Sequence, residues 1–299
     1  MAVAVFSHPS CALHDPGPGH PEAPGRIVAV LDALQALPGV ELITASPAAA
    51  PEDLLSVHTK AHLGHLAEVN AAGGGRLDPD TVMNAHSYGA MLGATGAVLA
   101  AVQRAHAGQG HAFAAVRPPG HHALADRVMG FCLVNTAVVA ARRFQALGRR
   151  RVLIVDWDVH HGNGTQALVE HDAEIRFVSL HQSPWWPFTG AASERGVGNV
   201  FNVPLPGGLA PEQYVRDLWL AVEAATRDWT PDALIVSAGF DAMAGDPLGG
   251  FTLEPRHYRV LTERLRERMP GVPILGTLEG GYIPGRLAKG AAAFVAALD

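Results

Sequence analysis

The chain has 299 residues, a length that suits one large α/β domain or two small ones and lets roughly 75% of the unfolded chain's surface be buried. The formal net charge is −6 and no run of lysine and arginine stands out, so the composition gives no electrostatic footprint for nucleic acid. No apolar stretch approaches the ~20 residues that a membrane span needs, so we expect neither nucleic acid nor a membrane as a partner.

Short runs of β-branched and aliphatic residues alternate with alanine- and leucine-rich segments along the chain. The runs predict strands at residues 2–6, 40–44, 112–116, 151–155, 175–179, 233–237 and 272–277. The segments between them predict helices at residues 26–36, 88–107, 133–147, 211–227, 255–268 and 285–298. This alternation is typical of parallel βαβ units, and strands that are apolar throughout indicate a sheet covered on both faces.

Three longer stretches, residues 7–25, 73–86 and 181–208, show neither pattern. Long loops in a compact α/β domain usually carry function, so we expect them around the mouth of a site. Three glycines at residues 73–75 form the most flexible-looking point, but they lie too early to divide two domains of sensible size. We therefore predict one domain over residues 1–299.

Cysteine usage and the N-terminal residues bear on the compartment. Cys11 and Cys132 are the only cysteines, so a disulfide framework is not expected and a reducing compartment fits. His8 and Pro9 come before any signal-peptide core could form, which favours a cytoplasmic protein. The oligomeric state stays open.

Four polar clusters each follow an apolar run of a predicted strand. They lie at residues 121–122, 156–161, 241 and 280–282, and they are rich in carboxylate, imidazole and phenol groups. In an open parallel sheet, ligands gather beyond the carboxyl ends of the strands. The four clusters therefore predict a single active site.

Asp158, His160 and Asp241 are the predicted metal ligands. Two carboxylates and one imidazole leave room for water and substrate, which is the form of a catalytic zinc site. Residues 158 and 160 are two apart, so on an extended segment they point the same way. Fe(II), Co(II) or Mn(II) remain open by geometry, and for Asp158 and His160 alone a strand-end turn with solvated acids is an equal alternative.

His121, His122 and Tyr282 are the predicted reactive groups. Amide hydrolysis needs a base that activates water and an acid that protonates the leaving amine, and histidine titrates in the range where it can do both. A phenol that follows two glycines could donate a hydrogen bond to a developing oxyanion. Surface histidines on a capped loop and a half-buried structural tyrosine are the alternatives.

Taken together, these motifs resemble the zinc-dependent histone deacetylase family, and its class II and bacterial branch in particular. The matching segments run in family order at residues 117–123, 130–132, 156–164, 178–181, 237–241, 245–247 and 279–282. The resemblance implies an arginase-like α/β fold of three layers, with a mainly parallel central sheet flanked by helices. It also implies hydrolysis of acetyl or other acyl groups from lysine side chains of proteins or peptides.

The resemblance implies a role for each matching position. Asp158, His160 and Asp241 would bind zinc; Fe²⁺ and Co²⁺ are the alternatives. Further implied catalytic positions are His121 with its partner Asp156, the general base His122 with its partner Asn163, and Tyr282. Implied substrate contacts and channel positions are Asp80, Gly130, Phe131, Leu248, Gly280, Gly281 and the inner arginine Arg26. A structural K⁺ is implied near Asp156, Asp158, His160, Ser179 and Leu180.

The sequence departs from the family pattern at the substrate channel. The channel wall opposite Phe131 is usually phenylalanine, and here Trp186 matches that wall, with Phe188 as the alternative. Leu248 stands where polyamine-selective relatives can carry an acid, which weakens a polyamine interpretation. An acetylpolyamine or other small-amide deacylase nevertheless remains the main alternative. A binuclear manganese ureohydrolase and a non-catalytic acyl-lysine binding module are less favoured, since the former typically uses an Asp-x-His-x-Asp order.

Overall fold

The computed structural model describes residues 3–299, which are built around one sheet of eight parallel strands. The strand order is β2-β1-β5-β10-β9-β6-β7-β8. The strands are β1 Val3–Phe6, β2 Val40–Ile43, β5 Ala112–Ala114, β6 Val152–Asp156, β7 Ile175–Gln182, β8 Val200–Leu205, β9 Ala233–Ala238 and β10 Ile274–Leu278. The central strands β5, β6, β9 and β10 are buried at every position because helices cover both faces of the sheet.

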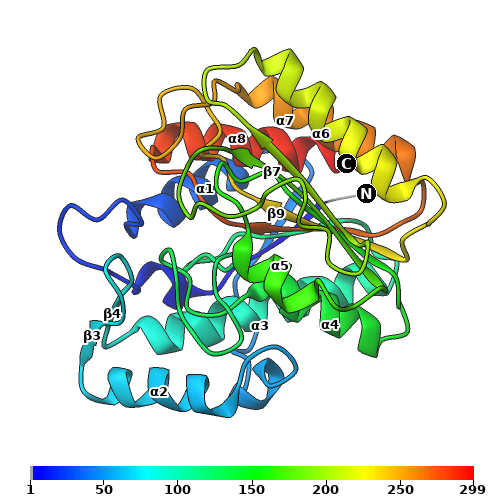
Figure 1. Cartoon of the computed structure of the whole chain (residues 1–299). Coiled ribbons are helices and arrows are strands. Elements are labelled where there is room, and N and C mark those ends of the chain that lie inside the picture. Colours follow the sequence, from blue (N-terminus) through cyan, green and yellow to red (C-terminus); the bar gives the residue numbers. More distant parts are fainter. Residues whose placement is uncertain (1–2) are drawn as a thin grey trace.

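Helices form a layer on each face of the sheet (Figure 1). One layer holds α1 Gly25–Gln35, α6 Pro211–Thr226, α7 Pro255–Arg268 and α8 Pro284–Ala297. The other holds α2 Lys60–Ala71, α3 Ser87–His106, α4 Thr136–Ala146 and α5 Asn163–Val169. Across residues 3–299, no helix combines the length and the hydropathy that crossing a bilayer requires.

The predicted α/β arrangement is confirmed, with the ends of elements moved by a few residues. The helix predicted from residue 133 begins at Thr136, because Asn135 caps it by accepting the Val138 N–H at 3.0 Å. The patterns therefore located seven of the eight strands of the main sheet and the helices α1, α3, α4, α6, α7 and α8, while α2 and α5 were not predicted.

Two of the stretches predicted to be irregular contain strands, so that prediction was wrong in part. β8 lies within residues 181–208, at the edge of the sheet, where it is half-exposed and interrupted by Asn202 and Pro204; it therefore lacks an apolar run. A hairpin of β3 Gly74–Arg76 and β4 Val82–Asn84 lies within residues 73–86. Gly74 serves the hairpin rather than a flexible link, because a Cβ there would lie 2.3 Å from the Met83 carbonyl oxygen.

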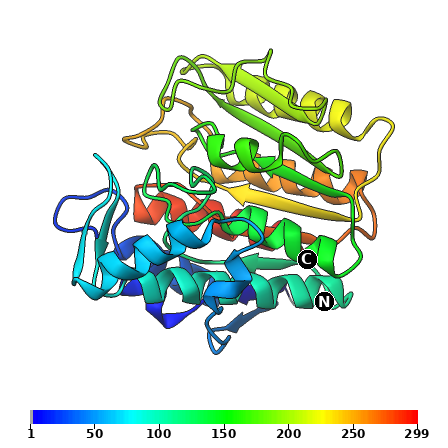
Figure 2. The same cartoon turned by 60° about the horizontal axis from the view of Figure 1, so that its bottom comes forward.

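The parallel sheet brings distant residues to one edge. Asp156 ends β6 and lies opposite Ser179 of β7 and Ser237 of β9 in the strand register. Figure 2 shows that the arrowhead of β9 points to the end of the molecule where the β3–β4 hairpin stands. Loops that leave the strands there come together, as the rule for parallel sheets requires.

A buried charge cluster anchors the N-terminal loop to this edge. Glu22, Arg26 and Arg117 are each at most 1% exposed. Glu22 Oε1 accepts from Arg26 at 2.7 Å, and its Oε2 accepts from Arg117 at 2.6 Å. Burial would raise the pKa of Glu22, but Arg117 and Arg26 hold that pKa well below its usual range. The cluster therefore keeps a charged carboxylate in the interior.

Glu22→Gln should lower the free energy of unfolding by about 3–5 kcal/mol, because it leaves two guanidinium groups buried without their carboxylate. The low pKa of Glu22 also means that its contribution is present above about pH 4 and is lost as the solution is acidified. Denaturant unfolding at pH 7 and in the acid range measures both effects. Glu41→Gln, which breaks a half-exposed pair with Arg104, is the control and should cost about 1 kcal/mol or less.

Candidate active site

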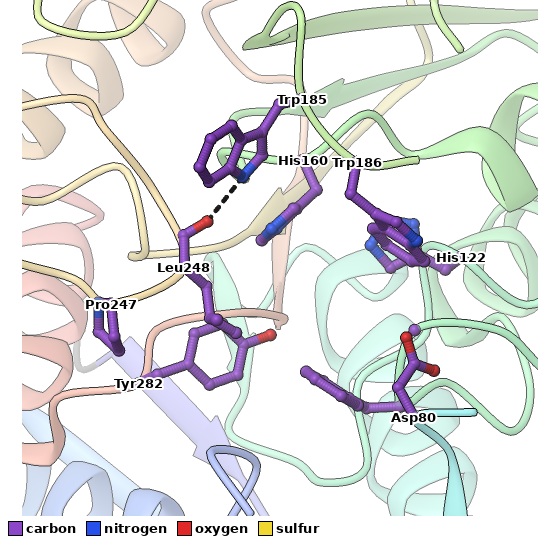
Figure 3. Close-up of a pocket in the computed structure, with 10 residues that line it drawn as sticks. Asp80, His122, His160, Trp185, Trp186, Pro247, Leu248 and Tyr282 are labelled. Carbon is purple, nitrogen blue, oxygen red and sulfur yellow. Dashed lines mark hydrogen bonds between the residues drawn. The ribbon is translucent and has the colours of Figure 1, made fainter. Parts of the chain in front are cut away.

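Ten residues line a cavity of about 250 Å³ at the carboxyl edge of the sheet (Figure 3). They come from seven separate places in the sequence: Asp80, His122, Gly130, Phe131, His160, Trp185, Trp186, Pro247, Leu248 and Tyr282. Apolar and aromatic side chains form most of the wall, and imidazole, phenol and carboxylate groups converge in it, which is the make-up of a small-molecule or side-chain binding site.

Asp158, His160 and Asp241 meet as a buried cluster beside this cavity. Each offers a ligand atom within 4.8 Å of the others, in an arrangement that could hold a metal ion. Asp241 Oδ2 is buried without a hydrogen-bond partner among the described residues, although His160 Nδ1 lies 3.3 Å away. Burial and the Asp158 carboxylate raise the pKa of Asp241 to about 7. A buried carboxylate oxygen that lacks a donor and repels its neighbour fits a bound cation.

We expected Asp158 and His160 to lie on an extended segment, but the backbone bends at residues 158–160. Each of its carboxylates accepts from the backbone two residues on: Asp156 Oδ1 from the Asp158 N–H at 3.1 Å, and Asp158 Oδ1 from the His160 N–H at 3.0 Å. These side-chain-to-backbone bonds turn the chain tightly at the strand end. Both residues still face the cluster.

Gly280 and Gly281 back the cluster instead of contacting the cavity, which corrects their expected role as substrate contacts. The Gly280 N–H donates to Asp158 Oδ2 at 2.8 Å, and a Cβ at Gly280 would lie 2.0 Å from Asp241 Oδ2. Gly281, with φ of 119°, offers its carbonyl to Arg26 Nε at 2.6 Å. Glycine is therefore needed at residue 280 because the backbone packs directly on the carboxylates.

His121 and His122 lie side by side, with ring centroids 3.9 Å apart, but have opposite surroundings. His121 Nδ1 lies 2.9 Å from Asp156 Oδ2, and His122 Nδ1 lies 2.7 Å from Asn163 Oδ1. Burial alone would lower the pKa of His121, but the carboxylates of Asp158 and Asp156 raise that pKa to about 10. Burial, His121 and His160 hold the pKa of His122 well below its ordinary value. One imidazole is thus held charged and the other neutral.

Glu279 is a buried site residue whose role we did not predict. Its Oε2 accepts from the Gly120 N–H at 2.7 Å and the His121 N–H at 3.2 Å, and its Oε1 accepts from Ser237 at 3.2 Å. It thereby fixes the loop that carries the two histidines to β9 and β10. Arg117 was missed in the same way. Both are charged residues that directly follow an apolar run, and that pattern could have marked them.

Tyr282 lies on the cavity wall, which it shares with His160 (Figure 3). Its N–H donates to Asp246 Oδ2 at 2.8 Å, and Arg26 Cζ lies 5.0 Å from the centre of its ring. Enclosure of the phenol and the Asp241 carboxylate raise the pKa of Tyr282 well above its ordinary value. The group therefore stays a neutral hydrogen-bond donor.

Aromatic side chains bound the cavity. Phe131 lies 5.8 Å from the Tyr282 ring, and Trp186 lies 4.7 Å from the His122 ring, edge to face. Phe188, the alternative to Trp186, is 78% exposed and lies outside the cavity lining, so it does not form the wall. A turn closed by a 2.8 Å hydrogen bond from the Phe188 N–H to the Trp185 carbonyl directs it away.

The mouth of the cavity is held by polar contacts. Trp185 Nε1 donates to the Leu248 carbonyl at 2.9 Å, which joins two loops on one side (Figure 3). Asp80 lies half-buried on the other side, at the tip of the β3–β4 hairpin. Ser179 and Leu180 lie on β7, next to the end of β6.

Asp158→Ala should abolish stoichiometric binding of a divalent metal ion, because it removes one of three ligands from a buried cluster. Elemental analysis of purified protein, with the metal restored and the excess removed, should give about one ion per wild-type chain and far less in the variant. Asp232→Ala is the control, since Asp232 pairs with Arg151 at the opposite end of β9. Equal metal content in all three proteins would contradict the site.

Comparison with known proteins agrees with this geometry. The histone deacetylase domain model matches residues 20–298. The histone deacetylase-like amidohydrolase of Pseudomonas aeruginosa is 36% identical over 277 residues, which cover 88% of this chain and 73% of the relative. The crystal structure of the HDA15 HD domain matches with a TM-score of 0.94 at 35% identity, over 99% of this chain and 90% of that one. An acetylpolyamine aminohydrolase from Burkholderia pseudomallei matches with a TM-score of 0.91 at 25% identity, over 99% and 98% of the two chains. The chain belongs to the histone deacetylase family and is an amide-hydrolysing deacetylase.

Proposed function

We propose that this deacetylase removes acetyl or other acyl groups from lysine side chains of proteins or peptides, with zinc as its metal. The observation that carries the proposal is the cavity itself, in which a neutral imidazole and a neutral phenol meet the Asp158–His160–Asp241 cluster beneath aromatic walls. An acyl-lysine is a long apolar stem that ends in a neutral amide, and these surroundings suit both parts.

Asp158, His160 and Asp241 would hold the zinc ion. The unpartnered Asp241 oxygen and the like charge of Asp158 support this assignment. Zinc, when bound, supplies Lewis acidity to an amide carbonyl and makes water more acidic. The same mixture of oxygen and nitrogen donors also suits Fe²⁺ and Co²⁺.

His122 acts as the general base in this proposal. Asn163 Oδ1 is an acceptor, so the 2.7 Å contact places a proton on His122 Nδ1 and leaves the Nε2 lone pair free. The lowered pKa of His122 keeps that nitrogen unprotonated near neutral pH. His122 Nε2 can therefore take a proton from water as the water oxygen bonds to the acyl carbon.

The same proton completes the reaction. The charged His121, held by Asp156, stabilises negative charge nearby but has no lone pair to offer as a base. His122 returns its proton to the lysine nitrogen as the carbon–nitrogen bond breaks, so the amine and the carboxylic acid leave with all atoms accounted for. Tyr282 donates its phenolic hydrogen bond to the former carbonyl oxygen as charge develops there.

The wall composition favours a lysine stem over a polyamine. Pro247, Leu248, Trp185 and Trp186 offer no carboxylate to a distant ammonium group. An acetylpolyamine deacylase remains the second candidate, since the Burkholderia pseudomallei relative of that type shares the fold and Asp80 on the rim carries an acid. A binuclear ureohydrolase is disfavoured because residues 3–299 gather one three-ligand group. A non-catalytic binding module is disfavoured because every proposed reactive group is present.

Further proposals concern the setting of the enzyme. We infer a structural K⁺ near Asp156, Asp158, His160, Ser179 and Leu180, supported by the surplus of buried carboxylates around them. We also propose that residues 1–299 form one catalytic domain and that it works in the cytoplasm, where its two free cysteines would stay reduced.

Tyr282→Phe should lower turnover by about 10²–10³-fold while leaving zinc content unchanged, because only a donor to the developing charge is lost. Acetate release from an acetyl-lysine peptide measures the first and elemental analysis the second. Tyr258→Phe is a matched control: it is buried, and its hydroxyl makes no hydrogen bond within residues 3–299. Near-normal turnover in Tyr282→Phe would overturn the role of the phenol.

A substrate panel tests the choice of amine. With zinc restored, we expect kcat/KM for acetyl-lysine and longer acyl-lysine peptides to exceed that for acetylspermidine by tenfold or more, because Pro247, Leu248 and the two tryptophans offer no partner to an internal ammonium and the one acid of the lining, Asp80, lies at the rim. Higher activity on acetylspermidine would favour the second candidate. Activity on neither would reject both.

A further inference from the structure

Phe131, which forms one wall of the cavity, has a left-handed backbone conformation that residues with a side chain rarely adopt. Gly130 and Phe131 follow one another in the left-handed region, with φ of 56° and 68°. Glycine accepts this readily, but a residue with a side chain does so only when its surroundings compel it. The wall is also tightly packed, since a Cβ at Gly130 would lie 2.5 Å from the His122 ring and 2.6 Å from Trp186. Something must therefore hold Phe131 in place.

The hydroxyl of Thr81 supplies one such restraint. It is buried at the tip of the β3–β4 hairpin, and its Oγ1 accepts the Phe131 N–H at 3.1 Å. The same hydroxyl donates to Asp80 Oδ1, also at 3.1 Å. One oxygen thus uses its acceptor and donor capacities to tie the wall of the cavity to the acid on its rim.

Two further residues, His20 and Asp78, support the same unit. The His20 ring packs edge-on against the Phe131 ring at 4.7 Å, and its Nε2 lies 3.1 Å from the Asp80 carbonyl oxygen. Asp78 braces the hairpin tip by accepting from the N–H groups of Asp80 and Thr81. These hydrogen bonds hold the hairpin tip rigid at Thr81. The Thr81 hydroxyl is therefore fixed in position, and its hydrogen bond fixes the backbone of Phe131.

We propose that Thr81 is a positioning residue that sets the width of the substrate channel by holding Phe131 and Asp80 as one unit. This inference rests on the proposed acyl-lysine function. Phe131 and Asp80 also line a second hollow beside residues 16–21, so they form the partition between that hollow and the cavity. Without the Thr81 hydroxyl, Phe131 loses the hydrogen bond that holds it in place. The lysine side chain of the substrate would then pack less closely against the Phe131 ring.

Thr81→Val tests this with almost no change in side-chain shape. KM for an acetyl-lysine peptide should rise about tenfold, the factor that one hydrogen bond of ordinary strength is worth, while kcat stays within about twofold. Thr81→Ser keeps the hydroxyl and should restore the wild-type KM. Thr95→Val is the control, because its buried hydroxyl bonds only within α3, to the Met91 carbonyl. An unchanged KM in Thr81→Val, or an equal loss in Thr81→Ser, would overturn the proposal.

Amide hydrogen exchange at Phe131 gives a readout that does not depend on the substrate. Exchange should quicken about tenfold in Thr81→Val and stay at the wild-type rate in Thr81→Ser and Thr95→Val. If the wild-type protein hydrolyses no acyl amide, the proposed function fails, while faster exchange in Thr81→Val still upholds the anchoring of Phe131. Unchanged exchange in Thr81→Val refutes the anchoring whatever the activity.

Discussion

Repulsion between buried carboxylates at the carboxyl edge of the sheet is the constraint on which the site depends. Asp156, Asp158, Asp241 and Glu279 are all fully buried there. Backbone N–H groups satisfy part of this charge, as at Gly280, and charged His121 satisfies another part. The negative charge that is not balanced in this way lies on Asp158 and Asp241. A divalent cation between these two carboxylates would replace their repulsion by attraction to the ion. The same carboxylates therefore determine both the affinity for a metal ion and the protonation states of His121 and His122.

The fold supplies the rigidity that such a cluster requires. Parallel strands buried on both faces fix where Asp156 ends β6, and Gly280 lets the backbone pack against the carboxylates of Asp158 and Asp241. The cluster of Glu22, Arg26 and Arg117 extends this rigidity to the N-terminal loop, since Arg26 also bonds the Gly281 carbonyl behind the phenol of Tyr282. Charges that would be unstable alone hold one another in place.

Apolar runs and strand-end polar residues predicted the sheet, the layers and the gathering of Asp158, His160 and Asp241, because burial imposes those patterns directly on the sequence. Features that depend on single contacts did not show. β8 was not predicted because a strand at the edge of a sheet tolerates residues such as Asn202 and Pro204, which interrupt the apolar pattern. The choice between Trp186 and Phe188 depended on one turn, and the part played by Thr81 depended on a hairpin that brings residues fifty positions apart together. No pattern in the sequence encodes such pairings.

The indole of Trp185, which bonds the Leu248 carbonyl, fastens two loops into a single edge of the entrance. That bond involves none of Asp158, His160 and Asp241, so the entrance and the proposed metal site are built from separate residues. Substitutions along this edge could change the shape of the entrance, and with it the substrates that fit, without altering the groups proposed for proton transfer and metal binding. Relatives with one reaction and many substrates would follow naturally from such a division.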